Sequence, residues 1–280
     1  MSRQETLLWI PCLVVVAASL AGCGEGTAPV GPLGAAPTQA PSTAKVAPIP
    51  CFPDEGPAVL RIAGVPVGEA VVVRSEKVMR LRLPGMSAET LRRKTIEDAI
   101  VPMAALYAGH AERIGDMSQR IRAASARLTR GDSFDAVAMD TGDDLSARNG
   151  GLYGTVTRSS AGIAQLPPGL EDRVFGATVA LASDPFAGLV GFQIIRVDKA
   201  VVAADGKSEQ RDLRHILVHY DALMASRMRK IDIKHPQLKE LLEQWQSEFT
   251  EKSRRLIQEA KVEVLDPAWR PLIYSFRLAK

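Results

Sequence analysis

The hydrophobic positions divide the chain into an apolar leader, a spacer without large apolar side chains, and a folded region. Arg3 precedes the run LLWIPCLVVVAASLAG, whose length of about sixteen residues suits the core of a signal peptide better than a membrane-spanning helix. From Gly24 to Pro50 the composition is mainly Ala, Pro, Thr and Gly, so this stretch cannot bury enough surface to offset its chain entropy. We therefore expect a cleaved leader followed by a flexible tether.

In the first part of the folded region, β-branched runs give way to a helical pattern. The segment PAVLRIAGVPVGEAVVVRS predicts a hairpin or two short strands around Gly64 and Gly68. Ser87 is a candidate helix cap, and Pro102 should kink the helix that follows. Apolar residues recur in that helix at mostly helical spacing: Leu91, Ile96, Ile100, Met103 and Tyr107.

The remaining patterns predict further helices and strands. A helix is expected from Met117 to Leu128, ending near Gly131, with a short apolar turn at Phe134 after it. A glycine-rich turn in NGGLYGTVTR leads into a strand, and PPGLEDRVFGA predicts a short helix opened by prolines. The imperfect alternation in GLVGFQIIRVDKAVV fits a central, two-sided strand. Near the C-terminus, HPQLKELLEQWQSEFTEKSRRLIQEA predicts a long helix with one broad apolar face, and KVEVLDP predicts a strand.

The composition argues against nucleic-acid binding, a metal site and an intramolecular disulfide. The formal net charge is +3, from 35 Lys+Arg against 32 Asp+Glu, so no single-sign field argues for nucleic acid. His219 and His235 lack partners at metal-ligand spacing, and we expect no metal site. If Cys23 carries a lipid and Cys12 leaves with the leader, Cys51 is the only free thiol and no intramolecular disulfide forms.

The end of the apolar leader, Leu20-Ala21-Gly22-Cys23, resembles the lipobox of bacterial lipoproteins. Small residues before the cysteine let a peptidase approach the backbone, and the thiol of Cys23 is the nucleophile that takes the lipid. The alternative is an ordinary secretory signal with an incidental cysteine. Gly24 stands where an aspartate commonly retains bacterial lipoproteins at the inner membrane. The resemblance therefore implies a cell-envelope lipoprotein on the periplasmic face of an outer membrane.

Four stretches in the middle of the chain resemble the parvulin family of peptidyl-prolyl cis-trans isomerases in their order and spacing. They are ARLTRGDSFDAVA, DDLSARNGGLYG, LEDRVF and GFQIIRV, and the most specific part is the double glycine followed three residues later by Gly154. The preceding pattern LRRKTIEDAIVPMAALYAGHAERIG resembles the N-terminal helical arm of SurA-like periplasmic chaperones.

The order of one strand departs from the family. Parvulins carry a HILV strand ahead of this block, whereas here RHILVHY follows it. In the parvulin sheet the first and last strands lie side by side at the centre, so a strand delivered after GFQIIRV can fill the same position. The chain is then circularly permuted within the fold. The alternative is that AIVPMAALY is the usual first strand and RHILVHY begins a truncated second copy.

Permutation makes a geometric prediction. RHILVHY should pair with GFQIIRV, and strand alternation should turn His215, Leu217 and His219 to one face. His215 should then lie within reach of Asp144 and Gln193, with a hydrogen bond to one of them.

By resemblance, His215 matches the histidine of the family's first strand and Asp144 its Cys-or-Asp position, with Asp143 as the alternative if the loop shifts by one. Gln193 stands where the second histidine is usual. The substrate-binding groove is expected to contain Leu166 in place of a methionine, Leu170 in place of a phenylalanine, and Phe175. The non-functional alternatives are that Asp143 and Asp144 are solvated residues that form a turn, and that His215 is a hydrogen-bonded histidine of the core.

The activity implied is non-covalent rotation about X-Pro bonds in proline-containing unfolded or nascent envelope proteins, without a cofactor. A glutamine hydrogen-bonds but does not titrate as histidine does. The alternative is therefore a catalytically silent, parvulin-like holdase that binds the same unfolded chains.

The fold class predicted is α+β, with a parvulin-like antiparallel sheet, surrounding helices, a helical N-terminal arm and a long C-terminal helix. The expected divisions are a signal peptide (1–22), a disordered lipidated tether (23–56), a strand and helix arm (57–115), a parvulin-like domain (116–220) and a C-terminal helical segment (221–280).

Overall fold

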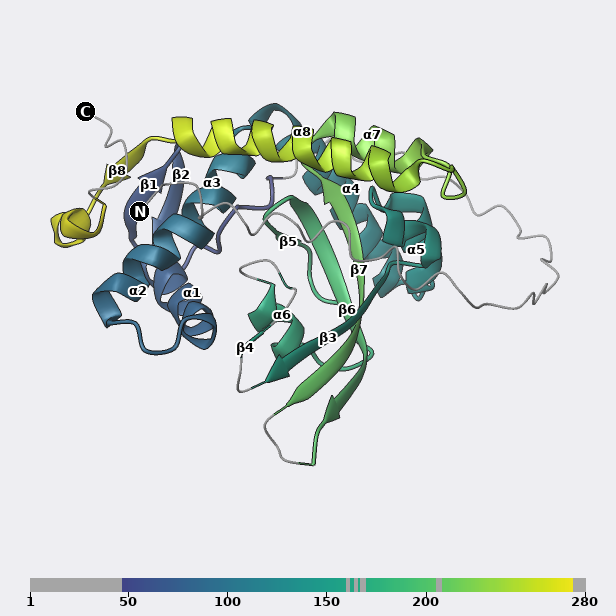
Figure 1. The fold of residues 1–280 in the computed structure, drawn as a ribbon, viewed down its shortest axis with the longest axis horizontal. Coiled ribbons are helices and arrows are strands. Elements are labelled where there is room, and N and C mark those ends of the chain that lie inside the picture. Colours follow the sequence, from purple (N-terminus) through teal and green to yellow (C-terminus); the bar gives the residue numbers. More distant parts are fainter. Residues whose placement is uncertain (1–46, 160–161, 164–165, 167–169, 205–207, 274–280) are drawn as a thin grey trace.

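The computed structural model describes residues 47–273, except 160–161, 164–165, 167–169 and 205–207. The expected signal peptide, the lipidation site Cys23 and most of the expected tether lie outside the described residues. The described chain is α+β, with two antiparallel sheets and helices around them, as the sequence predicts (Figure 1).

The smaller sheet joins the two ends of the described chain. Its strands are β1 (Ala58–Ile62), β2 (Val65–Gly68) and β8 (Val262–Val264), in the order β2-β1-β8. The predicted hairpin is confirmed, because β1 and β2 pair across a tight turn in which Gly64 has a φ of 85°. The arm expected at 57–115 and the end of the segment expected at 221–280 thus share one sheet and one core.

Helices pack on this sheet, and the longest helical run contains the predicted interruption. The elements are α1 (Glu69–Arg82), α2 (Ala88–Thr95), η3 (Ile96–Ile100), α3 (Val101–Ala108) and η5 (Pro267–Leu272). Ser87 caps α2, accepting a hydrogen bond from the Thr90 backbone N–H at 3.2 Å, as predicted. Pro102 lacks the N–H that would continue regular α-helical bonding. A π-helical turn, η3, lies directly before it.

The larger sheet has five strands and places β7 at its centre. The strands are β3 (Leu152–Ser159), β4 (Gly162–Ile163), β5 (Phe186–Ala187), β6 (Gly191–Val202) and β7 (Glu209–His219), in the order β4-β3-β7-β6-β5. Strands β6 and β7 form a long hairpin that projects below the rest of the molecule in Figure 1.

The pairing of β7 confirms the displaced strand. Its partners are β6 on one side and β3 on the other, and the register places Ile195 opposite His215 and Gln193 opposite Leu217. The alternative first strand, AIVPMAALY, is helical, in η3 and α3. The strand that the sequence resemblance expects before this block therefore follows it in the chain and lies at the centre of the sheet.

Helices α4 (Ala111–Thr129) and α5 (Phe134–Thr141) cover one face of the larger sheet. The side chains they bury there include Phe192, Ile194, Ile216 and Val218. Helix α4 begins at Ala111 rather than at the predicted Met117. Ser133 caps α5, which is a full helix where a short turn was expected. The opposite face meets α6 (Glu171–Gly176) and, by alternation, receives His215 and Gln193.

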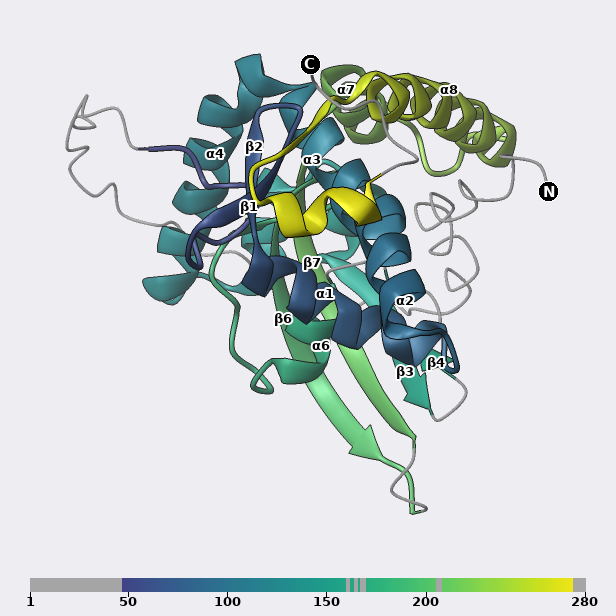
Figure 2. The same cartoon turned by 90° about the vertical axis from the view of Figure 1, so that its left-hand side faces the viewer.

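The C-terminal helices α7 (Ala222–Lys230) and α8 (Leu238–Glu259) follow β7. Helix α8 runs along the top of Figure 1, from β8 past the upper end of β7, and Figure 2 shows it beside α7. It holds the end of β7 through an ion pair between Lys252 and Asp221 at 2.5 Å and a ring contact between Phe249 and His219. Among the described helices, none combines the length and apolar character needed to cross a membrane.

The described end of the expected tether departs from the prediction. Ile49, Cys51 and Phe52 are buried, the Ile49 backbone N–H donates to Ser118 Oγ at 3.0 Å, and the Tyr107 hydroxyl donates to the Ile49 carbonyl at 2.8 Å. Two large apolar side chains, Ile49 and Phe52, supply the surface that the preceding Ala, Pro and Thr residues lack. Burial raises the pKa of the Cys51 thiol, which makes it unreactive.

Candidate functional site

The site is centred on a contact between β7 and the loop before β3. His215 Nε2 lies 2.8 Å from Asp144 Oδ2, and His215 is 7% exposed. Burial opposes ionisation of Asp144, but the charge and hydrogen bond of His215, together with further local hydrogen bonds, outweigh it, so the pKa of the carboxyl lies below its usual value. An ionised carboxylate only accepts hydrogen bonds, so the proton lies on Nε2 of His215. The predicted His215–Asp144 contact is confirmed.

Asp143, the alternative acid, faces the opposite way and is surrounded by structural partners. Its side chain has no exposed surface and pairs with Arg120 at 2.8 Å and Arg229 at 2.5 Å. It also accepts a hydrogen bond from the His219 backbone N–H at 2.9 Å. Burial raises the pKa of Asp143, and the neighbouring arginine opposes this. Of the two candidate acids, Asp144 is the one directed at His215.

The double glycine explains how this loop approaches β7. The His215 backbone N–H donates to the Gly151 carbonyl at 2.8 Å, and a Cβ at Gly151 would collide with the His215 carbonyl. Gly150 and Gly151 have φ angles of 62° and 78°, which residues other than glycine rarely adopt. The NGG motif is therefore required by the closeness of the two segments that carry Asp144 and His215.

An aromatic side chain completes the surroundings of His215. The ring of Tyr153, from β3, meets the His215 ring edge-on, with 5.0 Å between centroids. Sequence reasoning did not single out this residue, although it stands between the double glycine and Gly154. Its position in the glycine motif was a usable signal.

Gln193 shares the face of His215 without bonding to it. Gln193 lies opposite Leu217 in the register, two residues along each strand from the pair of Ile195 and His215. It is 5% exposed. Its amide packs against Gly188 with no room for a Cβ there, and its Oε1 has no hydrogen-bond partner in the described structure. Of the two partners expected for His215, Asp144 makes the hydrogen bond.

The three apolar residues expected in the groove lie on the same face, in one cluster. Leu166, Leu170 and Phe175 are 0%, 4% and 8% exposed. They pack with the neighbouring strand residues Val156, Ile195, Val197 and Leu213, and with Val174 and Phe186. The cluster adjoins His215, because Ile195 is its register partner. In this conformation the apolar cluster is closed.

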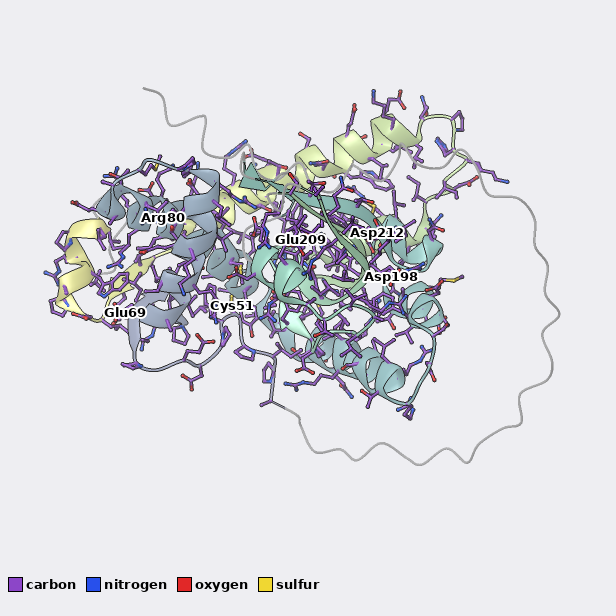
Figure 3. The ribbon with its side chains drawn as sticks, turned by 90° about the horizontal axis from the view of Figure 1, so that it is seen from below. Cys51, Glu69, Arg80, Asp198, Glu209 and Asp212 are labelled. Atoms are coloured by element: carbon purple, nitrogen blue, oxygen red, sulfur yellow. The ribbon has the colours of Figure 1, made fainter. Side chains whose placement is uncertain are left out.

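Charged side chains from β3 and β7 cover the cluster. Arg158 lies over the Phe175 ring, 4.6 Å from its centroid, and Arg211 lies at 5.6 Å. Glu209 pairs with both arginines, at 2.5 and 2.6 Å. Figure 3 labels Glu209 with two other acids of the hairpin of β6 and β7, Asp198 and Asp212.

A second cover comes from the N-terminal arm. Arg82, the last residue of α1, donates to the Leu166 carbonyl at 2.5 Å and forms an ion pair with Glu171 at the start of α6. The side chains of this pair are 4% and 2% exposed. Sequence reasoning missed Arg82, because it lies 84 positions before Leu166 and no local pattern joins them.

No cluster of His, Cys, Asp or Glu side chains within the described ranges has the geometry to hold a metal ion. The arrangement consists of a buried His–Asp pair next to a closed apolar cluster. Apolar walls with a few polar groups at their edge are typical of sites that take up apolar groups, although here the cluster is closed.

Comparison with protein families finds a match between residues 106–199 and the rotamase model described as the PPIC-type PPIASE domain. The match spans about a third of the chain and includes Asp144, Gln193 and the three apolar residues expected in the groove, Leu166, Leu170 and Phe175. It ends before β7, so His215 lies outside it. Neither the curated proteins nor the solved structures contain a match to this chain.

Proposed function

We propose that the protein isomerises X-Pro bonds in unfolded or nascent proteins of the cell envelope, on the premise that residues 106–199 match the PPIC-type PPIASE domain. The observation that carries this proposal is the hydrogen bond between His215 and Asp144, beside the apolar cluster of Leu166, Leu170 and Phe175. The activity requires no cofactor, because no bond is made or broken.

The chemistry is a rotation. Resonance across the X-Pro amide creates a barrier of about 18–20 kcal/mol, and twisting the bond removes that resonance. An apolar pocket that takes the proline ring out of water, with polar groups at its rim, stabilises the twisted amide more than the planar one. Asp144 holds the His215 ring at that rim, and the cluster supplies the apolar wall.

The test is catalysis of cis-trans exchange in a proline-containing tetrapeptide by the chain from Ala47 onward, since Ile49 belongs to the folded part. We expect acceleration in the unaltered protein and its loss in Asp144→Asn. The exposed Lys230→Gln serves as a matched control and should retain the activity. An unaltered protein that fails to accelerate the exchange would contradict the proposal.

A second candidate is a holdase that binds unfolded chains without catalysis. One observation favours it: Gln193 stands where the second histidine is usual in parvulins, and a glutamine does not titrate as histidine does. Suppression of client aggregation without acceleration of proline isomerisation would select the holdase over the isomerase.

The proposal includes an envelope location through a lipid on Cys23. It is supported by the lipobox-like sequence before Cys23 and by the tether after it, and Gly24 favours the outer membrane's periplasmic face. We expect Cys23→Ala to release the protein from the membrane fraction and change its mobility. A variant that stays equally membrane-bound would contradict the anchor.

A further inference from the structure

The loop that carries Asp144 is joined to the end of helix α7 from both sides. Arg229, from α7, donates through Nε to Asp143 Oδ1 at 2.5 Å and through Nη2 to the Thr141 carbonyl at 3.2 Å. In the other direction Arg148, from the 3-10 turn η4 (Leu145–Asn149), donates to the carbonyls of Met228 and Arg229 at 3.2 and 2.8 Å. These contacts flank Asp144 in the sequence.

The carboxylate of Asp143 is the central acceptor of this junction. Its side chain is fully covered, and it receives Arg120, Arg229 and the His219 backbone N–H. The backbone of Asp143 also donates to the Leu217 carbonyl at 2.8 Å, so the loop follows β7 directly. A buried carboxylate depends on every cation that faces it, because the loss of one partner leaves charge uncompensated.

Asp144 is the next residue along the chain, so the orientation of Asp143 sets where the Asp144 carboxyl points. Arg120 lies within the segment that matches the isomerase family, whereas Arg229 lies outside it. The guanidinium fork of Arg229 fixes two acceptors at once, which the single ammonium of a lysine does not reproduce.

We propose that Arg229 is a positioning residue for the isomerase site: by holding Asp143 and Thr141, it keeps Asp144 at hydrogen-bond distance from His215. The inference rests on the proposed function and deepens it, because it makes the site depend on a helix outside the family domain. Arg229 touches no substrate and acts through the loop.

The experiment compares Arg229→Gln and Arg229→Lys in the full chain, with Lys230→Gln on the same helix as the matched control. Misplacing a catalytic contact by about 1 Å costs up to about 100-fold in rate. We expect Arg229→Gln to lower kcat by about tenfold or more with little change in KM. We expect Arg229→Lys to recover only part of this loss and Lys230→Gln to match the unaltered protein.

A second readout separates this inference from the proposed function. The proton on His215 Nε2, held by Asp144, should give a protected imidazole resonance that weakens in Arg229→Gln and persists in Lys230→Gln. If the unaltered protein does not isomerise proline, the proposed function fails while this resonance still tests the positioning. A folded Arg229→Gln that keeps both the resonance and the activity overturns the inference. Should Arg229→Gln fail to fold, the same two results in Arg229→Lys overturn it.

Discussion

At the scale of single residues, Asp143 and Asp144 show how neighbours in sequence acquire opposite environments. The first is enclosed by two arginines and the second faces a histidine. The resemblance of the glycine motif and of RHILVHY to the parvulin pattern was sufficient to select Asp144 and His215 as partners. It could not decide fully between Asp143 and Asp144 as the partner of His215. That distinction depends on Arg120 and Arg229, which pair with Asp143 but lie in α4 and α7, outside the motif.

His219 is the residue whose charge should make stability depend on pH. It is 1% exposed, and its Nδ1 accepts a hydrogen bond from the Asp221 backbone N–H at 3.0 Å. Burial lowers the pKa of His219 from 6.5 to about 4. Between these values the unfolded chain binds a proton that the folded chain does not. The contribution of His219 to the free energy of unfolding should therefore be complete above pH 6.5 and be lost as the pH falls toward 4.

The slope contributed by His219 should approach about 1.4 kcal/mol per pH unit within that window. Urea unfolding at a series of pH values measures it. His219→Asn keeps an acceptor near the position of Nδ1 but removes the titration, so its curve should be flatter between pH 6.5 and 4. Parallel curves for the two proteins would show that His219 is not the cause.

At the scale of elements, the strands and long helices follow their sequence patterns, and the irregular segments do not. The displaced strand β7 was identifiable because its β-branched run sits between two histidines. The start of α4 was not, because residues 111–116 are mainly small or charged and show no apolar period. The π-helical form of η3 was also beyond a periodicity argument, although Pro102 indicated that regular bonding would be interrupted.

The ion pair between Arg82 and Glu171 joins α1 to α6, and its burial makes a clear prediction. Removing one partner leaves the other charge uncompensated, so Glu171→Gln should lower the free energy of unfolding by about 3 kcal/mol. Replacing both, as Arg82→Met with Glu171→Leu, should recover most of the loss. Urea unfolding of Arg82→Met, Glu171→Leu and the variant that carries both measures this coupling.

The matched control is Arg80→Met, on the exposed side of the same helix, where Figure 3 labels Arg80. It should change stability by less than about 0.5 kcal/mol. Equal losses in Arg80→Met and Glu171→Gln, or purely additive losses in the double variant, would argue against a buried pair between arm and domain.

At the scale of the whole molecule, the two ends of the described chain meet, and no sequence pattern indicated this contact. Leu60 of β1 lies opposite Val264 of β8 in the small sheet. Each strand was identifiable by its own β-branched residues, but their pairing depends on the packing of everything between them. The expected division into an N-terminal arm and a C-terminal segment describes the order of the chain, whereas the structure unites their strands.

The position of β7 predicts how fragments behave. Residues 106–199 match the family but lack the strand that lies between β3 and β6, so both would lose their shared partner. This fragment should be largely unfolded, with poorly dispersed amide resonances, whereas residues 47–273 should give a folded spectrum. A dispersed spectrum from 106–199 alone would mean that the domain folds without its central strand.

The central claim is that His215 from the displaced strand and Asp144 from the family domain act as one unit in proline isomerisation. A double-mutant cycle in kcat/KM for a proline tetrapeptide, with Asp144→Asn and His215→Gln, tests it most directly. Each single variant should lose about tenfold or more, and the double variant should lose no more than the worse single variant. Losses that multiply in the double variant, or single variants with unchanged kcat/KM, would contradict the account.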